Sequence, residues 1–293
     1  MKAAIFRRFG PAEELQTAQV GEPLPGDNEI LIRVIAAGLN PVDTKIRSGT
    51  HISCKDLKLP VIPGKEVSGV VAATGRQVRD LHPGDPVLAF LPANGACGEL
   101  AIAPAHLVVK KPENTTFEAA AALPLAGMTA FQAIHEHLAL TRGEHLLVQA
   151  AAGGVGHLAV QFANMAGAHV SGTASAENKD FLLKMGIDRP IDYKTERFEE
   201  IVPNLDAVLD AMGGEVLYRS ISNVKPGGRV VCLPSSTKDD PKAIALARER
   251  QIHLVWPMMQ PRQEQLQKIT SLLGEGKLHV EIDGVFPLEE IVE

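Results

Sequence analysis

The stretch AAGGVG at residues 151–156 has the residue types and spacing that point most directly to a chemical role. Ala151, Gly153 and Gly156 occupy the first, third and sixth positions of a G-x-G-x-x-G fingerprint, with alanine in the first place. The apolar run HLLVQA precedes the stretch, and a segment with apolar residues at helical spacing follows it. This is the strand–loop–helix context in which backbone N–H groups at a helix N-terminus bind the pyrophosphate of a dinucleotide.

Two glycines of this loop have an expected purpose. Gly153 lets the main chain approach the pyrophosphate, and Gly156 lets the helix pack closely against the strand. A tight strand–helix turn that holds no ligand is the alternative interpretation. The residues of the loop expected to bind the nucleotide are Ala151, Gly153, Gly154, Val155 and Gly156.

The residues after the second apolar run favour NADPH over NADH. An NAD site places Asp or Glu at the end of the second strand to bind the ribose 2′-OH, but Ala174 stands there. Ser175 and Lys179 follow and offer a hydroxyl and a cation to a 2′-phosphate, whereas Glu177 argues against one. An N-cap role for Ser175 and a solvated surface position for Lys179 are the alternatives.

The elements that position this loop alternate between strand and helix. Apolar runs predict strands at 145–150, 168–173, 205–212, 228–233 and 252–256, and helical spacing predicts helices at 154–167, 177–186, 214–225 and 241–251. Such alternation predicts a parallel sheet of right-handed βαβ units. A helix at 261–276, a strand at 279–288 and the first turns of another helix are expected to follow.

The first third of the sequence has a different pattern. Residues 1 to about 110 contain short apolar runs separated by Gly and Pro, which predict a first strand at the N-terminus and further strands at 29–40, 67–75, 85–90 and 99–110. This part is therefore expected to form a β-rich barrel or sandwich with long loops.

Length and composition exclude several classes of function. The 293 residues allow two domains, and 45% hydrophobic and 22% charged residues are ordinary for a globular protein. A net charge of −6 argues against sequence-independent nucleic-acid binding. Three widely spaced cysteines, Cys54, Cys97 and Cys232, form no disulfide framework, and no apolar run approaches the ~18 residues of a membrane span. We expect a cytoplasmic protein, because the N-terminal segment is also too short and too charged for a signal peptide.

Several segments together resemble the medium-chain dehydrogenase/reductase superfamily. They are AAGLNPVDTKIRSG (36–49), PVIPGKEVSGVVAATG (60–75), GDPVLAF (84–90), AAALPLAGMTAFQAI (120–134) and the glycine loop. The stretch GLNPVDTKIRSG is similar to the zinc-free quinone oxidoreductase (zeta-crystallin-like) branch. The resemblance implies an α/β fold with a Rossmann-type doubly wound parallel sheet and a β-rich GroES-like catalytic domain. The expected domains are 1–122 with 261–293 for substrate and catalysis, and 123–260 for the dinucleotide.

The zinc-dependent members of this superfamily provide a contrast. The positions that match their catalytic zinc ligands hold Asn40, Lys65 and Leu125, none of which supplies the thiolate, imidazole or carboxylate that zinc prefers. The cluster of four cysteines that binds a structural zinc is also missing from the sequence, so we expect no metal. Without a Lewis acid, quinones and α,β-unsaturated carbonyls are the favoured acceptors, because conjugation already makes a carbon electrophilic.

The resemblance also implies roles for individual residues. Asn40 and Thr129 are expected near the nicotinamide and the substrate, and Leu233 beside the nicotinamide. Lys45 stands where many relatives carry a tyrosine in the cleft, which argues against a tyrosine as proton donor, and it is expected to replace that tyrosine as a group that binds an oxygen. Tyr193 resembles the tyrosine that packs near the adenosine phosphate. The alternatives are a turn residue for Asn40, a backbone-bonded helix residue for Thr129, a surface lysine for Lys45 and a buried loop tyrosine for Tyr193.

These observations predict an NADPH-dependent, zinc-free reductase of quinones or α,β-unsaturated carbonyls. The alternatives are another enoyl reductase of the superfamily, acting for example on a thioester, and an NADPH-binding protein that does not catalyse. The substrate is expected to be a small molecule. A homodimer formed through the edge strand at 252–256 is also expected, because similar enzymes often extend their sheet in this way.

Overall fold

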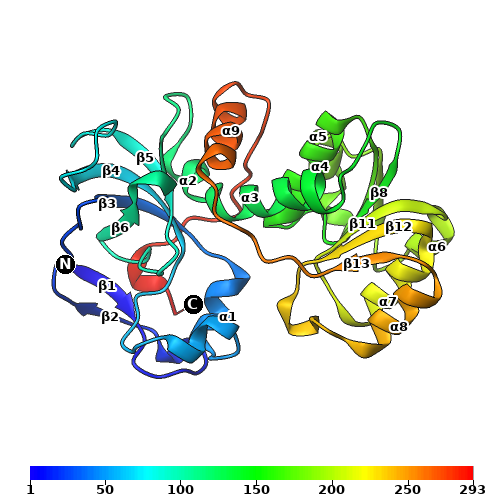
Figure 1. The fold of residues 1–293 in the computed structure, drawn as a ribbon, viewed down its shortest axis with the longest axis horizontal. Helices are drawn as coiled ribbons and strands as arrows, with labels where there is room; N and C mark the ends of the chain where they lie inside the picture. The colour runs from blue at the N-terminus through cyan, green and yellow to red at the C-terminus, as the bar shows by residue number, and fades with distance from the viewer. Residues whose placement is uncertain (293) are drawn as a thin grey trace. The chain divides into compact units, whose positions relative to one another are not determined.

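The computed structural model describes residues 1–292, which form two compact units (Figure 1). The first unit contains residues Met1–Met128 together with the chain from Pro261 onward, and the second contains Thr129–Gln260. The chain therefore leaves the first unit once and returns to it after the second unit is complete.

The first unit is built on an antiparallel sheet of five strands in the order β6-β3-β4-β5-β7. These strands are β3 (Glu29–Gly38), β4 (Glu66–Thr74), β5 (Pro86–Phe90), β6 (Leu100–Pro104) and β7 (Val108–Lys110), while β1 (Lys2–Ile5) and β2 (Gln16–Gln19) form a separate pair. The apolar residues of one face, such as Ile30, Val67 and Val87, are buried together in a core. The alternating pattern of these strands arises because one sheet face packs inward.

Four helices accompany this sheet. They are α1 (Pro41–Arg47), α2 (Phe117–Ala121), α3 (Pro124–Gln132), which continues into the second unit, and α9 (Gln263–Gly274). Thr116 caps α2 by accepting a hydrogen bond from the backbone N–H of Ala119. Helix α9, orange in Figure 1, contacts β7 although the two elements are far apart in sequence.

The second unit is a doubly wound sheet of six parallel strands in the order β10-β9-β8-β11-β12-β13. The strands are β8 (His145–Val148), β9 (His169–Ala174), β10 (Arg189–Asp192), β11 (Leu205–Asp210), β12 (Val224–Cys232) and β13 (His253–Val255). Counted from β8 along the chain, this is the order 3-2-1-4-5-6 of the Rossmann fold. The predicted α/β fold class is therefore confirmed.

Helices cover both faces of this parallel sheet. Figure 1 shows α4 (Gly154–Ala166) and α5 (Lys179–Lys184) on one face and α6 (Phe198–Ile201), α7 (Gly214–Asn223) and α8 (Pro241–Glu249) on the other. All of these helices are short, since even α4 has only 13 residues. Among residues 1–292, no helix combines the length and the apolar character that crossing a membrane requires.

Some predicted elements were wrong in part or altogether. The strand expected at 279–288 does not form, because alternating side chains make a strand only where a second backbone completes the ladder, and Gly284 and Pro287 interrupt this segment. The run at 99–110 is two strands separated by a 3₁₀ turn, Ala105–Leu107. A single 3₁₀ turn, Leu288–Glu290, follows where a helix start was expected, and residue 293 lies outside the described residues.

Close packing between α4 and the loop before it requires glycine, a residue without a side chain, at position 156. A Cβ at Gly156 would lie 2.3 Å from the carbonyl oxygen of Ala150 and 2.8 Å from the Cα of Ala151. A Cβ at Gly154, two residues earlier, would meet no heavy atom within 4 Å. The expectation that Gly156 lets the helix approach the strand therefore has a direct steric basis.

Substitution of these two glycines should separate packing from ligand access. We predict that Gly156→Ala lowers the free energy of unfolding by about 1–3 kcal/mol or more, because the added methyl group overlaps backbone atoms. Gly154→Ala, the matched control, should change it by less than about 0.5 kcal/mol. Urea unfolding of both variants checks this, and equal stability of the two proteins would contradict the steric account.

Candidate functional site

The glycine loop presents its main chain at the carboxyl end of β8. Gly153 precedes α4 as its N-cap, and Gly153 and Gly154 are exposed, whereas Ala151 and Gly156 are buried. The first N–H groups of a helix, here those of Gly154, Val155 and Gly156, have no partner within the helix. The loop therefore offers exposed backbone donors and a partial positive charge, which together suit an anionic group such as a phosphate.

A buried polar network holds this loop. Ala150 adopts a left-handed backbone conformation with φ of 55°, which is unfavourable for a residue with a side chain. The hydroxyl of Thr173 accepts a hydrogen bond from the Ala150 N–H (3.1 Å) and donates one to the Gln149 side chain (2.6 Å). Gln149 in turn donates to the hydroxyl of Ser220 at 3.1 Å. The carboxyl ends of β8 and β9 are thus tied together directly beneath the loop.

The same network reaches the end of β11. Asp210 is fully buried and accepts hydrogen bonds from the backbone N–H groups of Met212 (2.8 Å) and Gly213 (2.6 Å). Burial raises the pKa of this carboxyl group. The backbone N–H of Leu233, after β12, donates to the Asp210 carbonyl at 2.8 Å, which places half-buried Leu233 at the same edge of the sheet. Sequence reasoning missed Gln149, Thr173 and Asp210 because their burial depends on the assembled sheet.

The residues expected to meet a 2′-phosphate lie after β9. Ala174 is buried at the strand end, and the Ser175 hydroxyl accepts a hydrogen bond from the Asn178 side chain at 3.0 Å. Lys179 begins α5 and is exposed. Glu177, the residue that argued against a phosphate, forms an ion pair of 3.7 Å with Lys194.

Tyr193 lies beside the same strand end. Its backbone N–H donates to the carbonyl of Ala174 at 3.2 Å, and its side chain is 62% exposed. It is therefore not a buried loop tyrosine, which was one of its two expected states. Among the predicted nucleotide residues, Ser175 and Tyr193 are thus neighbours, with Lys179 one turn further along the chain.

In the first unit, Asn40 connects two elements through its side chain. It lies between β3 and α1, where its backbone N–H donates to the Asp43 carboxylate at 2.8 Å. Its side-chain nitrogen Nδ2 donates to Oε1 of Glu66 at 2.6 Å. Glu66, at the start of β4, is only 2% exposed and also accepts the backbone N–H of Leu125 at 2.6 Å. No role was predicted for Glu66, although it belongs to the segment PVIPGKEVSGVVAATG that carries the family resemblance.

Charged groups gather near Asn40. Burial raises the pKa of Asp43 to about 6, and one of its carboxylate oxygens, Oδ1, is buried without a hydrogen-bond partner. Burial also lowers the pKa of Lys65, whose Nζ donates to the carbonyl of Pro92 at 2.8 Å. The pKa of His51 is lowered by burial and then by the charges of Lys65 and Lys45. Half-buried Lys45 and Lys65 therefore bring two positive charges close to His51, an arrangement that suits an acceptor oxygen gaining negative charge.

The residues at the three zinc positions do not fit a zinc ion. Asn40 and Lys65 present N–H donors to neighbouring oxygens, and Leu125 contributes a backbone N–H, whereas zinc needs lone pairs from its ligands. Nearby Cys97 is buried, which raises the pKa of its thiol to about 12. Residues 1–292 contain no group of three or more His, Cys, Asp or Glu side chains arranged to hold a metal. No catalytic step through zinc can be assigned to this set of residues.

Thr129 lies in helix α3, four residues after Leu125. Residues at this spacing share one face of a helix, and both residues are half-buried while Ala126, Gly127 and Met128 between them are buried. Thr129 is therefore on the same face of α3 as the side chain of Leu125.

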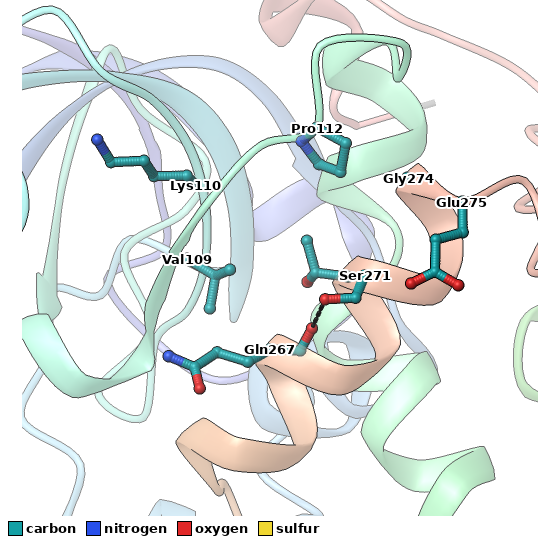
Figure 2. Close-up of a pocket in the computed structure, with 8 residues that line it drawn as sticks. Val109, Lys110, Pro112, Gln267, Ser271, Gly274 and Glu275 are labelled. Atoms are coloured by element: carbon teal, nitrogen blue, oxygen red, sulfur yellow. Dashed lines mark hydrogen bonds between the residues drawn. The ribbon is translucent and has the colours of Figure 1, made fainter.

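Surface grooves of the first unit lie away from these residues. Figure 2 shows one of about 570 Å³ between α9 and the segment that follows β7, lined by Val109, Lys110, Pro112, Gln267, Thr270, Ser271, Gly274 and Glu275. The Ser271 hydroxyl in its wall donates to the Gln267 carbonyl of its own helix at 3.0 Å. None of the predicted site residues lines this groove, so its size alone does not identify the site.

The raised pKa of Glu66 predicts a specific dependence of stability on pH. Burial raises this pKa from 4.5 to about 7, so the folded chain binds the proton more tightly than the unfolded chain. Glu66 therefore favours folding most below pH 4.5, and this contribution is lost as the pH rises through about 7. We predict that wild type loses up to about 3 kcal/mol over this interval relative to Glu66→Gln, which cannot titrate.

Urea unfolding at pH 5, 6, 7 and 8 measures this difference. Glu99→Gln is the matched control, because Glu99 also accepts a backbone N–H, that of Lys2, but is exposed. Parallel pH dependences for wild type and Glu66→Gln would contradict the buried-carboxylate interpretation.

Comparison with known proteins agrees with this geometry. Residues 26–113 match the alcohol dehydrogenase GroES-like domain family, and residues 185–293 match the zinc-binding dehydrogenase family. The chain is 34% identical to a chloroplast envelope quinone oxidoreductase homolog of Arabidopsis thaliana, over 99% of this chain and 92% of that protein. It is 30% identical to an NADPH-dependent alkenal/one oxidoreductase of the same plant, over 100% of this chain and 75% of that protein.

A solved structure gives the same result. The quinone oxidoreductase from Coxiella burnetii superposes with a TM-score of 0.93 at 35% identity, over 100% of this chain and 93% of that one. Two family matches in the expected order and full-length similarity therefore assign the chain: it belongs to the medium-chain dehydrogenase/reductase superfamily, in its quinone oxidoreductase branch.

Proposed function

We propose that this chain is an NADPH-dependent reductase of quinones or α,β-unsaturated carbonyls that works without a metal. The observation that carries the proposal is the chemistry at Asn40, Lys65 and Leu125, where hydrogen-bond donors replace zinc ligands. These donors bond to oxygens of the protein and leave no lone pair for a zinc ion, so the acceptor that fits is one that conjugation has already activated. The names of the similar proteins support this choice of acceptor.

The second unit is the proposed nucleotide-binding domain. The N–H groups of the loop Ala151–Gly156 would hold the pyrophosphate of NADPH, and Ser175, Lys179 and Tyr193 would surround its adenosine phosphate. Leu233 would border the nicotinamide. When bound, NADPH supplies the hydride that the reaction requires. The exposed backbone of Gly153 and Gly154 supports this assignment, because no side chain prevents a phosphate from approaching.

The first unit is the proposed catalytic domain. Asn40 would orient the nicotinamide and the acceptor, and Lys45 would donate a hydrogen bond to the acceptor oxygen. The same orienting role is proposed for Thr129, which belongs to the second unit. The charges of Lys45 and Lys65, which both act on His51, support the role of Lys45, because positive charge favours the oxygen as its negative charge develops. Positioning and electrostatic stabilisation of this kind are sufficient for an acceptor that is already electrophilic.

A homodimer in the cytoplasm completes the proposal. Strand β13 is at the edge of the six-stranded sheet, and Val255 in it is 40% exposed. An exposed edge strand can pair with the same strand of a second copy.

All three cysteines are free thiols, which suits a reducing compartment.

Cofactor selection tests this function most simply. We predict that the protein oxidises NADPH faster than NADH with 1,4-naphthoquinone or 3-buten-2-one as acceptor. Lys179→Ala should lower the ratio of kcat/KM for NADPH to that for NADH about tenfold, because it removes a charge-assisted hydrogen bond to the phosphate. Lys184→Ala is the matched control, because Lys184 is also an exposed lysine of α5 but lies in its last turn.

Other outcomes of the assay would replace the proposal. Equal losses with both cofactors would remove Lys179 from the phosphate site. Turnover that requires an enoyl thioester would favour the other enoyl reductases of the superfamily. Saturable NADPH binding with no turnover of any acceptor would favour a protein that does not catalyse.

A further inference from the structure

The buried carboxylate of Glu66 has a separate donor on each of its oxygens. Oε1 accepts from Nδ2 of Asn40 and Oε2 from the backbone N–H of Leu125, both at 2.6 Å. Short bonds of this kind are typical of an ionised acceptor. Burying a carboxylate is costly unless its oxygens are paired in this way, so the arrangement has a purpose that a buried apolar residue would not serve.

The carboxylate fixes the orientation of the Asn40 amide. An ionised carboxylate can only accept hydrogen bonds, so the atom of Asn40 that faces it must be the nitrogen. The carbonyl oxygen Oδ1 and the second N–H of the amide then point in defined directions. A neutral partner able both to donate and to accept would allow the amide to turn over and exchange the two.

The second bond anchors the start of α3. Leu125 is the second residue of this helix, where backbone N–H groups lack a partner within the helix and a negative charge is favourable. Thr129 follows one turn later in the same helix. One carboxylate therefore links the side chain of Asn40 to the first turn of the helix that carries Thr129.

Neighbouring backbone packs closely around the carboxylate. A Cβ at Gly38, which pairs with Glu66 across β3 and β4, would lie 2.5 Å from Oε1 and 2.8 Å from the carbonyl oxygen of Ala121. Glycine at this position makes room for the carboxylate, while β3 and α2 close the space around it.

We propose that Glu66 is a positioning residue of the reductase, which sets the orientation of the Asn40 amide and holds the first turn of α3. The inference rests on the proposed function, because Asn40 and Thr129 matter only if the chain reduces an acceptor. Glu66 itself touches neither cofactor nor substrate in this role. It acts through Asn40 and α3 by supplying two acceptors of fixed geometry.

The role requires the ionised form, since a proton on either oxygen removes one of the two acceptors. Burial raises the pKa of Glu66 to about 7, and the charge of Asp43 on α1 raises it further. The other elements packed against it contribute backbone, from Gly38 of β3, Phe90 of β5 and Ala121 of α2. Adjacent Lys65 directs its Nζ to the carbonyl of Pro92. The switch between the two forms therefore falls near neutral pH.

Steady-state kinetics of Glu66→Gln between pH 5.5 and 8.5 test the proposal, with saturating NADPH and 1,4-naphthoquinone. Wild-type kcat should fall as the pH drops below about 7. In Glu66→Gln, kcat should be at least tenfold lower at pH 8 and should lose this limb of the profile, while KM for NADPH changes less than twofold. Glu99→Gln, an exposed acid-to-amide change, should keep the wild-type profile.

Each result decides the matter. If wild type shows no turnover with any acceptor, the proposed function fails before Glu66 is in question. If wild type turns over and Glu66→Gln retains its kcat and pH limb, Glu66 has no positioning role. Parallel losses of kcat, NADPH affinity and melting temperature, with the pH limb retained, would show a merely structural role and overturn the proposal.

A second variant covers the case in which Glu66→Gln does not fold. Glu66→Asp keeps the charge but shortens the side chain by one methylene, so it cannot reach both donors. It should lower kcat at least fivefold and keep the low-pH limb, because a carboxylate still titrates at this position. A folded Glu66→Asp variant with full kcat would overturn the proposal.

Discussion

The second unit, the proposed nucleotide-binding domain, depends on the close approach of helix α4 to the loop that precedes it. Gly156 has only a hydrogen atom where any other residue has a Cβ, and a Cβ there would overlap the carbonyl oxygen of Ala150. This approach brings the N-terminus of α4 to the carboxyl edge of the parallel sheet. The hydroxyl of Thr173 and the side chain of Gln149 then hold the loop from below, and Ala150 keeps its left-handed conformation. Such support favours the proposed binding of a phosphate to the main chain, because a flexible loop would lose conformational entropy on binding.

The first unit, the proposed catalytic domain, contains a different arrangement. Asn40, Lys65 and Leu125 present hydrogen-bond donors rather than lone pairs, and buried Glu66 accepts from two of them. A carboxylate and an amide are thus paired among residues that do not fit a zinc ion. Lys65 lies near Asp43, and the charges of Lys65 and Lys45 both act on His51, so the region has positive charge available for an acceptor oxygen without a Lewis acid. This combination favours substrates that conjugation has already activated.

Local sequence patterns were sufficient for the elements with strong periodicity. The glycine loop and five of the six parallel strands follow from apolar runs and turn residues. Strand β10 was missed because RPID is short, begins with Arg and Pro and becomes a strand only by pairing with β9. The segment 279–288 shows the opposite error, since its alternation has no backbone partner to complete a ladder. The role of Glu66 could not be predicted for a related reason. Leu125, whose backbone N–H is the second hydrogen-bond donor to Glu66, is 59 residues away in sequence.

Transfer of deuterium from NADPH that carries deuterium at both C4 positions of the nicotinamide tests the central claim most directly. The protein would first be treated with a strong chelator, and the reduced enone would be analysed by mass spectrometry and NMR. A metal-free hydride transfer predicts one deuterium at the carbon β to the carbonyl, with an undiminished rate. Loss of activity after chelation, or a product without deuterium, would contradict it.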